Sequence, residues 1–358
     1  MGNVKRWTKA LLCIVLALVL LAGAYVAYVF IDYHRIGDQT LTAEGEAAAQ
    51  SAAVGQPYQI ISYNIGFGAY ESDYGFFMDG GTESRAWSKE RLNRNLAHIA
   101  AFLHGEAPDF CLLQEVDIDA TRSYHVDERL PLYQALPEMC HVFAQNYDSP
   151  FLMYPIFRPH GASRSGLLTF SCAQIGSAQR TELPIEGGFM KLLDLDRCYS
   201  TSRIQVEEGK ELVLYNFHLS AYTSDGTIAT EQLKLLLADM QGEYEKGNWC
   251  VAGGDFNKDL LGDSSAWFGA ADRDYSWAQP IPADTFDGYH IALVAPLDEN
   301  NPVPSCRNAD SAYHEGQYVL TVDGFLVSDN VAVDSAAVVD TGFEWSDHNP
   351  VAMTFTLK

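Results

Sequence analysis

The chain has 358 residues and a net charge of −24, with 47% hydrophobic and 12% aromatic residues. This hydrophobic content is enough for a large core and excludes a mainly disordered chain. Four basic residues and one acid precede residue 36, so the remainder is more acidic than the whole. Such a surface repels polyanions and disfavours a long nucleic-acid footprint, although a bound divalent cation reverses the charge locally.

Residues 10–31 form an uncharged apolar run with no polar face. This length spans the hydrocarbon core of a bilayer, which is about 30 Å thick. Basic side chains in residues 1–9 keep the short N-terminus cytoplasmic, which predicts a single-pass signal anchor at the cell membrane and an extracytoplasmic domain. The alternative is a signal peptide cleaved at the small residues 22–24, which would make the protein secreted.

Residues 32–57 lack strand patterning and predict a linker, whereas residues 58–358 predict one catalytic domain without a second linker or repeat. Apolar residues at helical spacing predict helices around residues 92–103 and 233–240. Runs rich in β-branched and aromatic residues predict strands at 58–63, 110–113, 167–171, 211–217, 249–253, 318–327 and 351–357. Strands and helices mix without strict alternation, which favours a layered α/β fold over a barrel of βα repeats.

The seven cysteines show no zinc-binding spacing. Several lie in short apolar runs, where a cysteine usually packs as a small buried hydrophobe. One pair among Cys140, Cys198 and Cys306 is a candidate disulfide, but spacing does not decide the pairing.

Polar side chains flank the predicted strands, where layered α/β folds build their sites. The set holds four carboxylates, two histidines and two asparagines: Glu115, Asp255, Asp323, Asp347, His218, His348, Asn64 and Asn257. Each residue alone is ordinary, but burying so many ionisable groups together costs several kcal/mol per unpaired charge. The set therefore indicates a metal or catalytic site, and its oxygen-rich ligands suit hard cations.

Asn64 closes the first predicted strand, and the other seven residues lie, in order, in the segments LLQEVD, YNFHLSAY, GGDFN, VDGFLVSDN and SDHNPV. Over residues 58–358 their order and spacing resemble the endonuclease/exonuclease/phosphatase superfamily, which includes deoxyribonuclease-like nucleases and neutral sphingomyelinases. The resemblance implies an α/β fold in which two mixed β-sheets pack as a sandwich, with helices on both outer faces in four layers. It also implies a divalent-metal-dependent hydrolase of phosphoester bonds.

The resemblance implies a role for each carboxylate and asparagine. Glu115 is the expected main metal ligand, with Asn64 beside it and Asp347 joining directly or through water. Asp255 is expected to orient or deprotonate the attacking water, and Asn257 to hold the phosphate or the water in line.

The two histidines are expected to stabilise the phosphoryl transition state. His348 would contact the phosphate while Asp323 fixes its tautomer and charge, and His218 would stabilise the pentavalent state or assist the leaving oxygen. Gly66 stands where the abasic-endonuclease subgroup has a second acid. This departure favours one ion, Mg²⁺ or Mn²⁺, with Ca²⁺ as a third option.

Further residues are candidates for substrate binding. Arg122 and Arg164 are scarce cations in an acidic chain, and each is either a phosphate clamp or part of an ordinary ion pair. Asn146 precedes the predicted strand at 167–171, and Tyr222 follows His218 on the leaving-group side. The aromatic loop 70–81 either lines the cavity or is a packed surface loop.

The favoured hypothesis is hydrolysis of a small or lipid phosphoester outside the cytoplasmic membrane, because anchoring through residues 10–31 brings the site near lipid head groups. An extracytoplasmic nuclease is the alternative, although the acidic surface disfavours nucleic acid as a substrate. A catalytically inactive, membrane-tethered binding domain is a second alternative, disfavoured because every expected catalytic position is filled. The natural substrate and the oligomeric state stay open.

Overall fold

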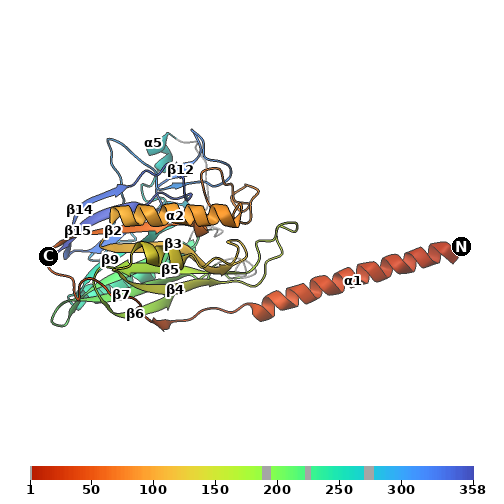
Figure 1. Ribbon diagram of the computed structural model, residues 1–358, viewed down its shortest axis with the longest axis horizontal. Helices are drawn as coiled ribbons and strands as arrows, with labels where there is room; N and C mark the ends of the chain where they lie inside the picture. Colours follow the sequence, from red (N-terminus) through yellow and green to blue (C-terminus); the bar gives the residue numbers. More distant parts are fainter. Residues whose placement is uncertain (1, 188–194, 222–226, 270–277) are drawn as a thin grey trace.

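The computed structural model of the chain contains two large β-sheets packed face to face, from which one long helix projects (Figure 1). It describes residues 2–187, 195–221, 227–269 and 278–358. One sheet has six strands, in the order β14 (Val331–Val338), β15 (Val351–Leu357), β2 (Pro57–Asn64), β3 (Phe110–Ala120), β5 (Ser163–Ser171) and β4 (Cys140–Asp148).

The other large sheet has seven strands, in the order β1 (Gln39–Leu41), β6 (Ile175–Glu182), β7 (Cys198–Glu207), β8 (Lys210–His218), β9 (Trp249–Asp255), β13 (Asp323–Ser328) and β10 (Ile291–Val294). Both sheets are mixed, because β2 and β3 run parallel in one and β8 and β9 run parallel in the other. A separate two-stranded ribbon joins β11 (Cys306–Arg307) and β12 (Val319–Leu320).

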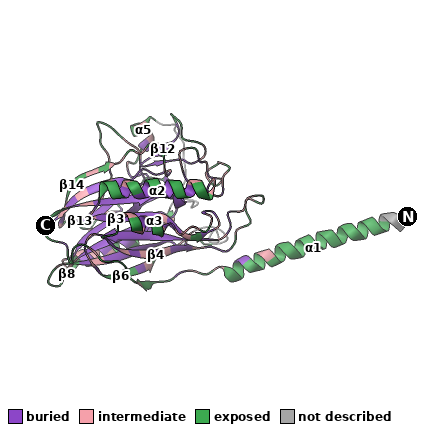
Figure 2. Cartoon of the chain, viewed as in Figure 1, coloured by how far each residue is buried: buried purple, intermediate pink, exposed green. Residues whose placement is uncertain are grey.

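Alternating apolar side chains fill the space between the sheets. In β2, Ile60 belongs to the inter-sheet core whereas Ile61 packs toward the helices outside. Leu214 of β8 and Val251 of β9 enter the inter-sheet core from the opposite sheet. This division follows from strand geometry, because successive side chains of a strand point to opposite faces. Figure 2 shows the resulting buried layer inside the sandwich.

Helices cover both outer faces of the sandwich. The six-stranded sheet is covered by α2 (Lys89–Glu106) and α3 (Arg129–Ala135), and the seven-stranded sheet by α4 (Thr227–Glu245). The α2 helix begins where the Ser88 hydroxyl accepts a hydrogen bond from the Arg91 amide at 3.2 Å, as an N-cap residue does. Short turns α5 (Ser264–Phe268) and η1 (Gly66–Gly68) lie in the connections. The four-layer fold predicted from the sequence is confirmed.

Three details differ from the sequence-based expectations. The predicted strand at 318–327 is two strands, β12 and β13, which pair in different sheets. The predicted linker 32–57 is not a free tether, since β1 pairs with β6 and Ala52 is buried in the inter-sheet core. The seven cysteines, all in the described part of the chain, are free thiols, so the candidate disulfide is not formed.

The N-terminal helix α1 (Gly2–Asp32) lies outside the sandwich and is exposed along most of its length (Figure 2). Only its last turns meet the domain, where Val29 is buried. By length and composition this helix is suited to cross a membrane, and a signal sequence has the same properties.

Packing of α2 against the six-stranded sheet gives a stability prediction. Leu96 of α2 is buried in the core beneath the helix. We expect Leu96→Ala to lower the free energy of unfolding by about 2–5 kcal/mol, because the change leaves a cavity. The matched control Leu130→Ala removes the same atoms from an exposed position on α3 and is expected to change it by less than about 0.5 kcal/mol. Equal effects of the two variants in chemical denaturation would contradict this packing.

Candidate active site

The site lies where the inter-sheet core ends. Asn64, His218, Asp255 and Asp323 stand at strand ends, each in the row of side chains that faces the opposite sheet. In the seven-stranded sheet, His218 and Asp323 are the register partners of Asp255 on either side. The same alternation that fills the core with apolar side chains therefore brings these polar side chains together.

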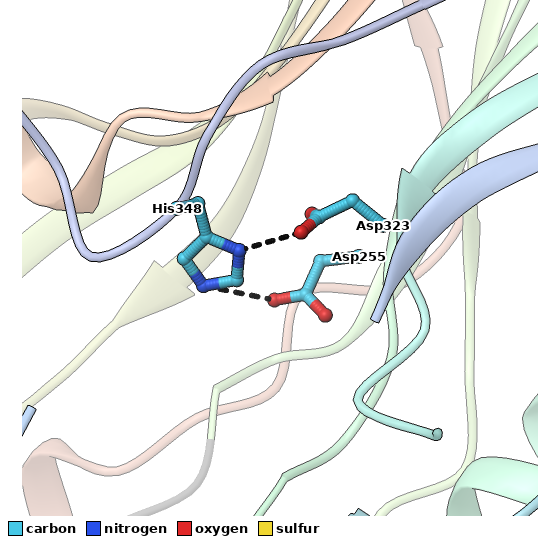
Figure 3. A group of neighbouring side chains, drawn as sticks. All are labelled: Asp255, Asp323 and His348. Atoms are coloured by element: carbon cyan, nitrogen blue, oxygen red, sulfur yellow. Dashed lines mark hydrogen bonds and ion pairs between the residues drawn. The ribbon is translucent and has the colours of Figure 1, made fainter. Parts of the chain in front are cut away.

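Three side-chain nitrogens converge on one oxygen of Asp255, and Figure 3 shows the contact from His348. Asn64 Nδ2 donates to Asp255 Oδ2 at 3.2 Å, and Nε2 of His218 and of His348 lie 3.4 and 3.8 Å from the same oxygen. The other oxygen, Oδ1, accepts the Asn257 amide at 2.8 Å. Burial raises the pKa of Asp255 to about 7, although His348 acts in the opposite direction. Asp255 is thus a carboxylate held ready to accept a proton.

His348 and Asp323 form a buried pair next to Asp255. His348 Nδ1 lies 2.8 Å from Asp323 Oδ2, and the Ser305 hydroxyl donates to the same oxygen at 2.7 Å. Burial disfavours the imidazolium, but the charge of Asp323, aided by the Cys306 thiol, raises the pKa of His348 well above its ordinary value. His348 is therefore a cation whose Nδ1–H is held by Asp323, leaving Nε2–H directed toward Asp255.

His218, in contrast to His348, has a lowered pKa. Burial lowers its pKa well below the ordinary value, and the nearby positive charges of Arg197 and His348 add to this effect. Its Nδ1 atom is buried without a hydrogen-bond partner among the described residues. The two histidines on either side of Asp255 are thus a neutral ring and a charged ring.

Glu115 reaches the site through an irregularity in β3. The register between β3 and β5 shifts between Leu113 and Val116, and Glu115 has a φ of 55°. A β-bulge of this kind turns a side chain away from its regular direction, and positive φ in a residue other than glycine is uncommon. As a result the Glu115 carboxylate accepts a hydrogen bond from Asn64 Nδ2 at 3.2 Å. One amide nitrogen therefore bridges Glu115 and Asp255.

The orientation of Asn64 differs from the ligand role expected for it. Its Oδ1 atom accepts the Gly66 amide at 3.0 Å, so the nitrogen, which cannot bind a cation, faces the carboxylates. Asn64 orients Glu115 and Asp255 in this arrangement. Glu115 and Asp347, the other carboxylates expected near the metal, both line the cavity.

Glu115 and Asp347 fit a hard divalent cation. Burial raises the pKa of Asp347 to about 6, and the negative charge of Glu115 adds to this effect. A cation between the two would stabilise both charged forms and accept their free oxygens as ligands. A Cβ atom at Gly66 would lie 2.9 Å from the Tyr70 ring and 3.2 Å from Asp347 Oδ1, so no acidic side chain fits at this position. This crowding agrees with a single ion.

A second group could hold a metal by distance alone. Ligand atoms of Asp255, Asp323 and His348 lie within 4.8 Å of one another. However, His348 Nδ1 and Asp323 Oδ2 are already joined by a hydrogen bond of 2.8 Å, which a cation at this position would have to displace.

Three buried arginines line the cavity above these residues: Arg122, Arg197 and Arg307. Arg122 donates two hydrogen bonds to Asp117, at 2.8 and 3.0 Å, and its guanidinium lies 4.0 Å from the centre of the Phe67 ring. Burial disfavours its charge, but Asp117 raises its pKa above the ordinary value. Five acidic side chains line the same cavity, and the three arginines supply the cations that an anionic ligand would need there.

The remaining candidates for substrate binding differ in where they lie. Arg164 is exposed on β5, and its nearest acid is Asp148 at 3.6 Å; it does not line the cavity. Asn146 is fully buried on β4, and neither of its amide atoms has a hydrogen-bond partner among the described residues. Tyr222 lies outside the described residues. From the aromatic loop 70–81, Tyr70 and three further residues line the cavity.

Several cavity residues were not predicted from the sequence. Arg197, Arg307, His160 and Cys306 all line the cavity. Arg197 and Arg307 could have been predicted by the criterion used for Arg122, because every arginine is a scarce cation in this acidic chain. The segment containing Cys306 and Arg307 carries no motif, but it reaches the site because Cys306 pairs with His348 through an isolated β-bridge.

The family model described as Endonuclease/Exonuclease/phosphatase family matches residues 61–348. The chain belongs to this family. Members of the family are generally hydrolases of phosphoester bonds, and the chain is a hydrolase of this superfamily. A comparison with curated proteins finds no match.

Solved structures of this family have the same fold. The protein from Beutenbergia cavernae is 19% identical with a TM-score of 0.55, and the match covers 84% of this chain and 72% of that chain. The protein from Bacteroides vulgatus is 15% identical with a TM-score of 0.54, and the match covers 85% of this chain and 100% of that chain. ANGEL2, described as a 2',3'-cyclic phosphatase, is 16% identical with a TM-score of 0.54, and the match covers 88% of this chain and 98% of that chain. At these identities the likeness shows the fold alone.

The ligand assignment predicts an effect of Mg²⁺ on thermal stability. A ligand that binds only the folded state stabilises it by about 2.7 kcal/mol at a hundred times its Kd. We expect Mg²⁺ to raise the Tm of the full chain in detergent, and Glu115→Gln to abolish this shift. The control Asp119→Asn changes an exposed carboxylate on the same strand and should retain it. An undiminished shift in the Glu115 variant would exclude Glu115 as the main ligand.

Proposed function

We propose that the chain is a membrane-anchored, divalent-cation-dependent phosphoesterase that hydrolyses a small or lipid phosphoester outside the cytoplasmic membrane. The proposal is carried by the convergence on Asp255 Oδ2 of an amide, a neutral imidazole and a charged imidazole. This arrangement orients one carboxylate beside Glu115 and Asp347, in a cavity that three buried arginines also line.

In the proposed reaction, Asp255 accepts a proton from the attacking water while the water oxygen forms a bond to phosphorus. Asn64 and Asn257 fix the carboxylate through hydrogen bonds to its two oxygens. A base with a pKa near 7 is well matched to this task at neutral pH. The bond between phosphorus and the leaving oxygen then breaks, and the leaving oxygen keeps the electron pair and takes up a proton from water.

The charge that develops on the phosphoryl group is stabilised by His348, which donates through Nε2 while Asp323 holds Nδ1. A cation held by Glu115 and Asp347, with Mg²⁺ or Mn²⁺ favoured and Ca²⁺ as an option, would polarise the phosphoryl oxygens and offset their charge. His218 is neutral and orients Asp255 from the opposite side, with its Nδ1 available to accept a hydrogen bond. Arg122 is positioned to bind a further anionic oxygen of the substrate.

The acidic surface favours a small or lipid phosphoester over nucleic acid, since a net charge of −24 opposes contact with a long polyanion. The test incubates the full chain and Mg²⁺ with an aryl phosphodiester, phospholipid vesicles and plasmid DNA in parallel. We expect hydrolysis of the first two and loss of activity with EDTA. Preferential cleavage of plasmid DNA would favour an extracytoplasmic nuclease, and no activity on any substrate would favour an inactive binding domain.

The central role of Asp255 predicts the effect of its amide variant. We expect Asp255→Asn to lower kcat by at least about 100-fold, because removal of a general base typically has this effect. The control Asp119→Asn should retain full activity and the same melting temperature as the wild type. An active Asp255→Asn variant would show that another group accepts the proton.

The difference between the two predicted arginines gives a further test. Arg122→Lys keeps the charge beside Asp117 but loses the two parallel hydrogen bonds and the planar fork. We expect kcat/KM to fall roughly tenfold, in line with the loss of one charged hydrogen bond. The matched variant Arg164→Lys should leave kcat/KM unchanged, because Arg164 lies outside the cavity. Equal effects of the two variants would refute this assignment.

A further inference from the structure

Five large apolar side chains are exposed in one short segment, residues 151–157, which we call the apolar loop. They are Phe151, Met153, Tyr154, Ile156 and Phe157. Ile156 is 75% exposed and Phe157 is completely exposed. Elsewhere in the described part of the domain, exposed side chains of this kind are isolated along the sequence. Isolated exposed apolar residues are normal, but a contiguous apolar patch marks a surface that binds a partner.

The sequence around the apolar loop is unusual for this chain because it lacks acidic residues. No Asp or Glu occurs between Asp148 and Glu182, although the chain has 47 acidic residues. The charged residue nearest the loop, Arg158, forms an ion pair with Glu83. Because the loop itself carries no acid, its insertion into a lipid interface brings no carboxylate of its own toward anionic head groups. The acid beside it is Asp32 at the end of α1, which accepts a hydrogen bond from the Tyr28 hydroxyl at 3.3 Å.

The apolar loop lies against the end of α1. The Tyr25 hydroxyl accepts the Met153 amide at 2.9 Å and donates to the Phe151 carbonyl at 3.2 Å. The Tyr28 hydroxyl accepts the Phe151 amide at 3.0 Å. Tyr25 stands seven residues before the helix end at Asp32, so the loop runs beside about the last 10 Å of α1. Tyrosines near the end of a span typically lie at the level of the lipid head groups.

The apolar loop is also connected to the mouth of the cavity. The ring of Tyr154 lies 5.6 Å from that of Phe77, and Phe76 and Met78 on either side of Phe77 line the cavity. Met78 is itself partly exposed and extends the apolar surface. His160, three residues after Phe157, lines the cavity as well. Whatever covers the apolar loop therefore lies beside the entrance to the site.

We infer that the apolar loop inserts into the outer leaflet of the bilayer that α1 crosses, and that it holds the cavity mouth against the lipid head groups. This inference rests on the membrane anchoring and phosphoesterase activity proposed above. The occupant is the lipid bilayer because α1 and the loop are joined by three hydrogen bonds at the level of the interfacial tyrosines. Apolar side chains at an interface typically enter about 5–10 Å into the boundary between head groups and acyl chains. The site would then act on phosphoesters carried by lipids of the same leaflet.

The experiment that tests insertion does not depend on catalysis. The full chain carrying Phe157→Trp is reconstituted in phosphatidylcholine vesicles, with and without brominated acyl chains, and compared with the wild type to isolate the added tryptophan. Brominated chains should quench most of the added fluorescence. The control Val333→Trp places a tryptophan at an exposed position of β14, at the end of the domain far from α1 (Figure 1), and should not be quenched.

An unquenched tryptophan at position 157 would overturn the inference, since the loop would then face water or a second copy of the chain. Equal quenching at position 333 would also overturn it, because the contact would not be specific to the loop.

A second readout links insertion to the substrate. Phe157→Ser should lower hydrolysis of a phospholipid in vesicles roughly tenfold, the effect of losing one buried apolar side chain. Hydrolysis of a soluble aryl phosphodiester should be unchanged, and Val333→Ser should alter neither rate. Equal loss on both substrates would contradict a role at the membrane. If the wild type hydrolyses neither substrate, the proposed function fails, while the quenching result still decides whether the loop inserts.

Discussion

The site depends on burying a carboxylate at the end of an apolar core without leaving its charge unpaired. Asp255 is 1% exposed, and an isolated buried charge costs several kcal/mol in a protein interior. The fold offsets this cost because alternation along the strands delivers Asn64 and His218 to the same space, while the pair of His348 and Asp323 completes the shell. These contacts do not offset the whole cost of burial, and the remainder raises the pKa of Asp255 to about 7. A carboxylate with this pKa is suited to accept a proton at neutral pH.

A buried polar layer directly beneath the site joins the two sheets. Gln114 Nε2 donates to Asn216 Oδ1 across the sheets at 2.9 Å and to Ser62 Oγ at 3.2 Å within its own sheet. Asn216 in turn donates to the Leu113 carbonyl at 3.1 Å. Directional hydrogen bonds fix the relative position of the sheets more closely than apolar contacts do. Residues on either side, such as Glu115 and His218, are therefore held in a fixed relation to each other, as catalysis requires.

The sequence was sufficient to predict the fold and the strand ends that meet, because the motifs around Asp255 and His348 stand at the ends of strongly apolar strands. It did not reveal side-chain direction. Arg122 and Arg164 were equivalent in sequence, yet one lines the cavity and the other is exposed on β5. The cations Arg197 and Arg307 carried no motif and enter the cavity only through tertiary contacts. The bulge at Glu115 and the reversed amide of Asn64 depend on hydrogen bonds between distant segments, which no local pattern encodes.

We propose that one hard cation binds beside, and not within, the group formed by Asp255, Asp323 and His348. A crystal structure of the full chain with Mn²⁺ and a phosphate analogue, phased to locate manganese by its anomalous scattering, tests this most directly. We expect one manganese peak within coordination distance of Glu115, with Asp347 in its shell directly or through water. A manganese ion coordinated by His348 and Asp323, with Glu115 outside its shell, would show that the cation binds within this group instead.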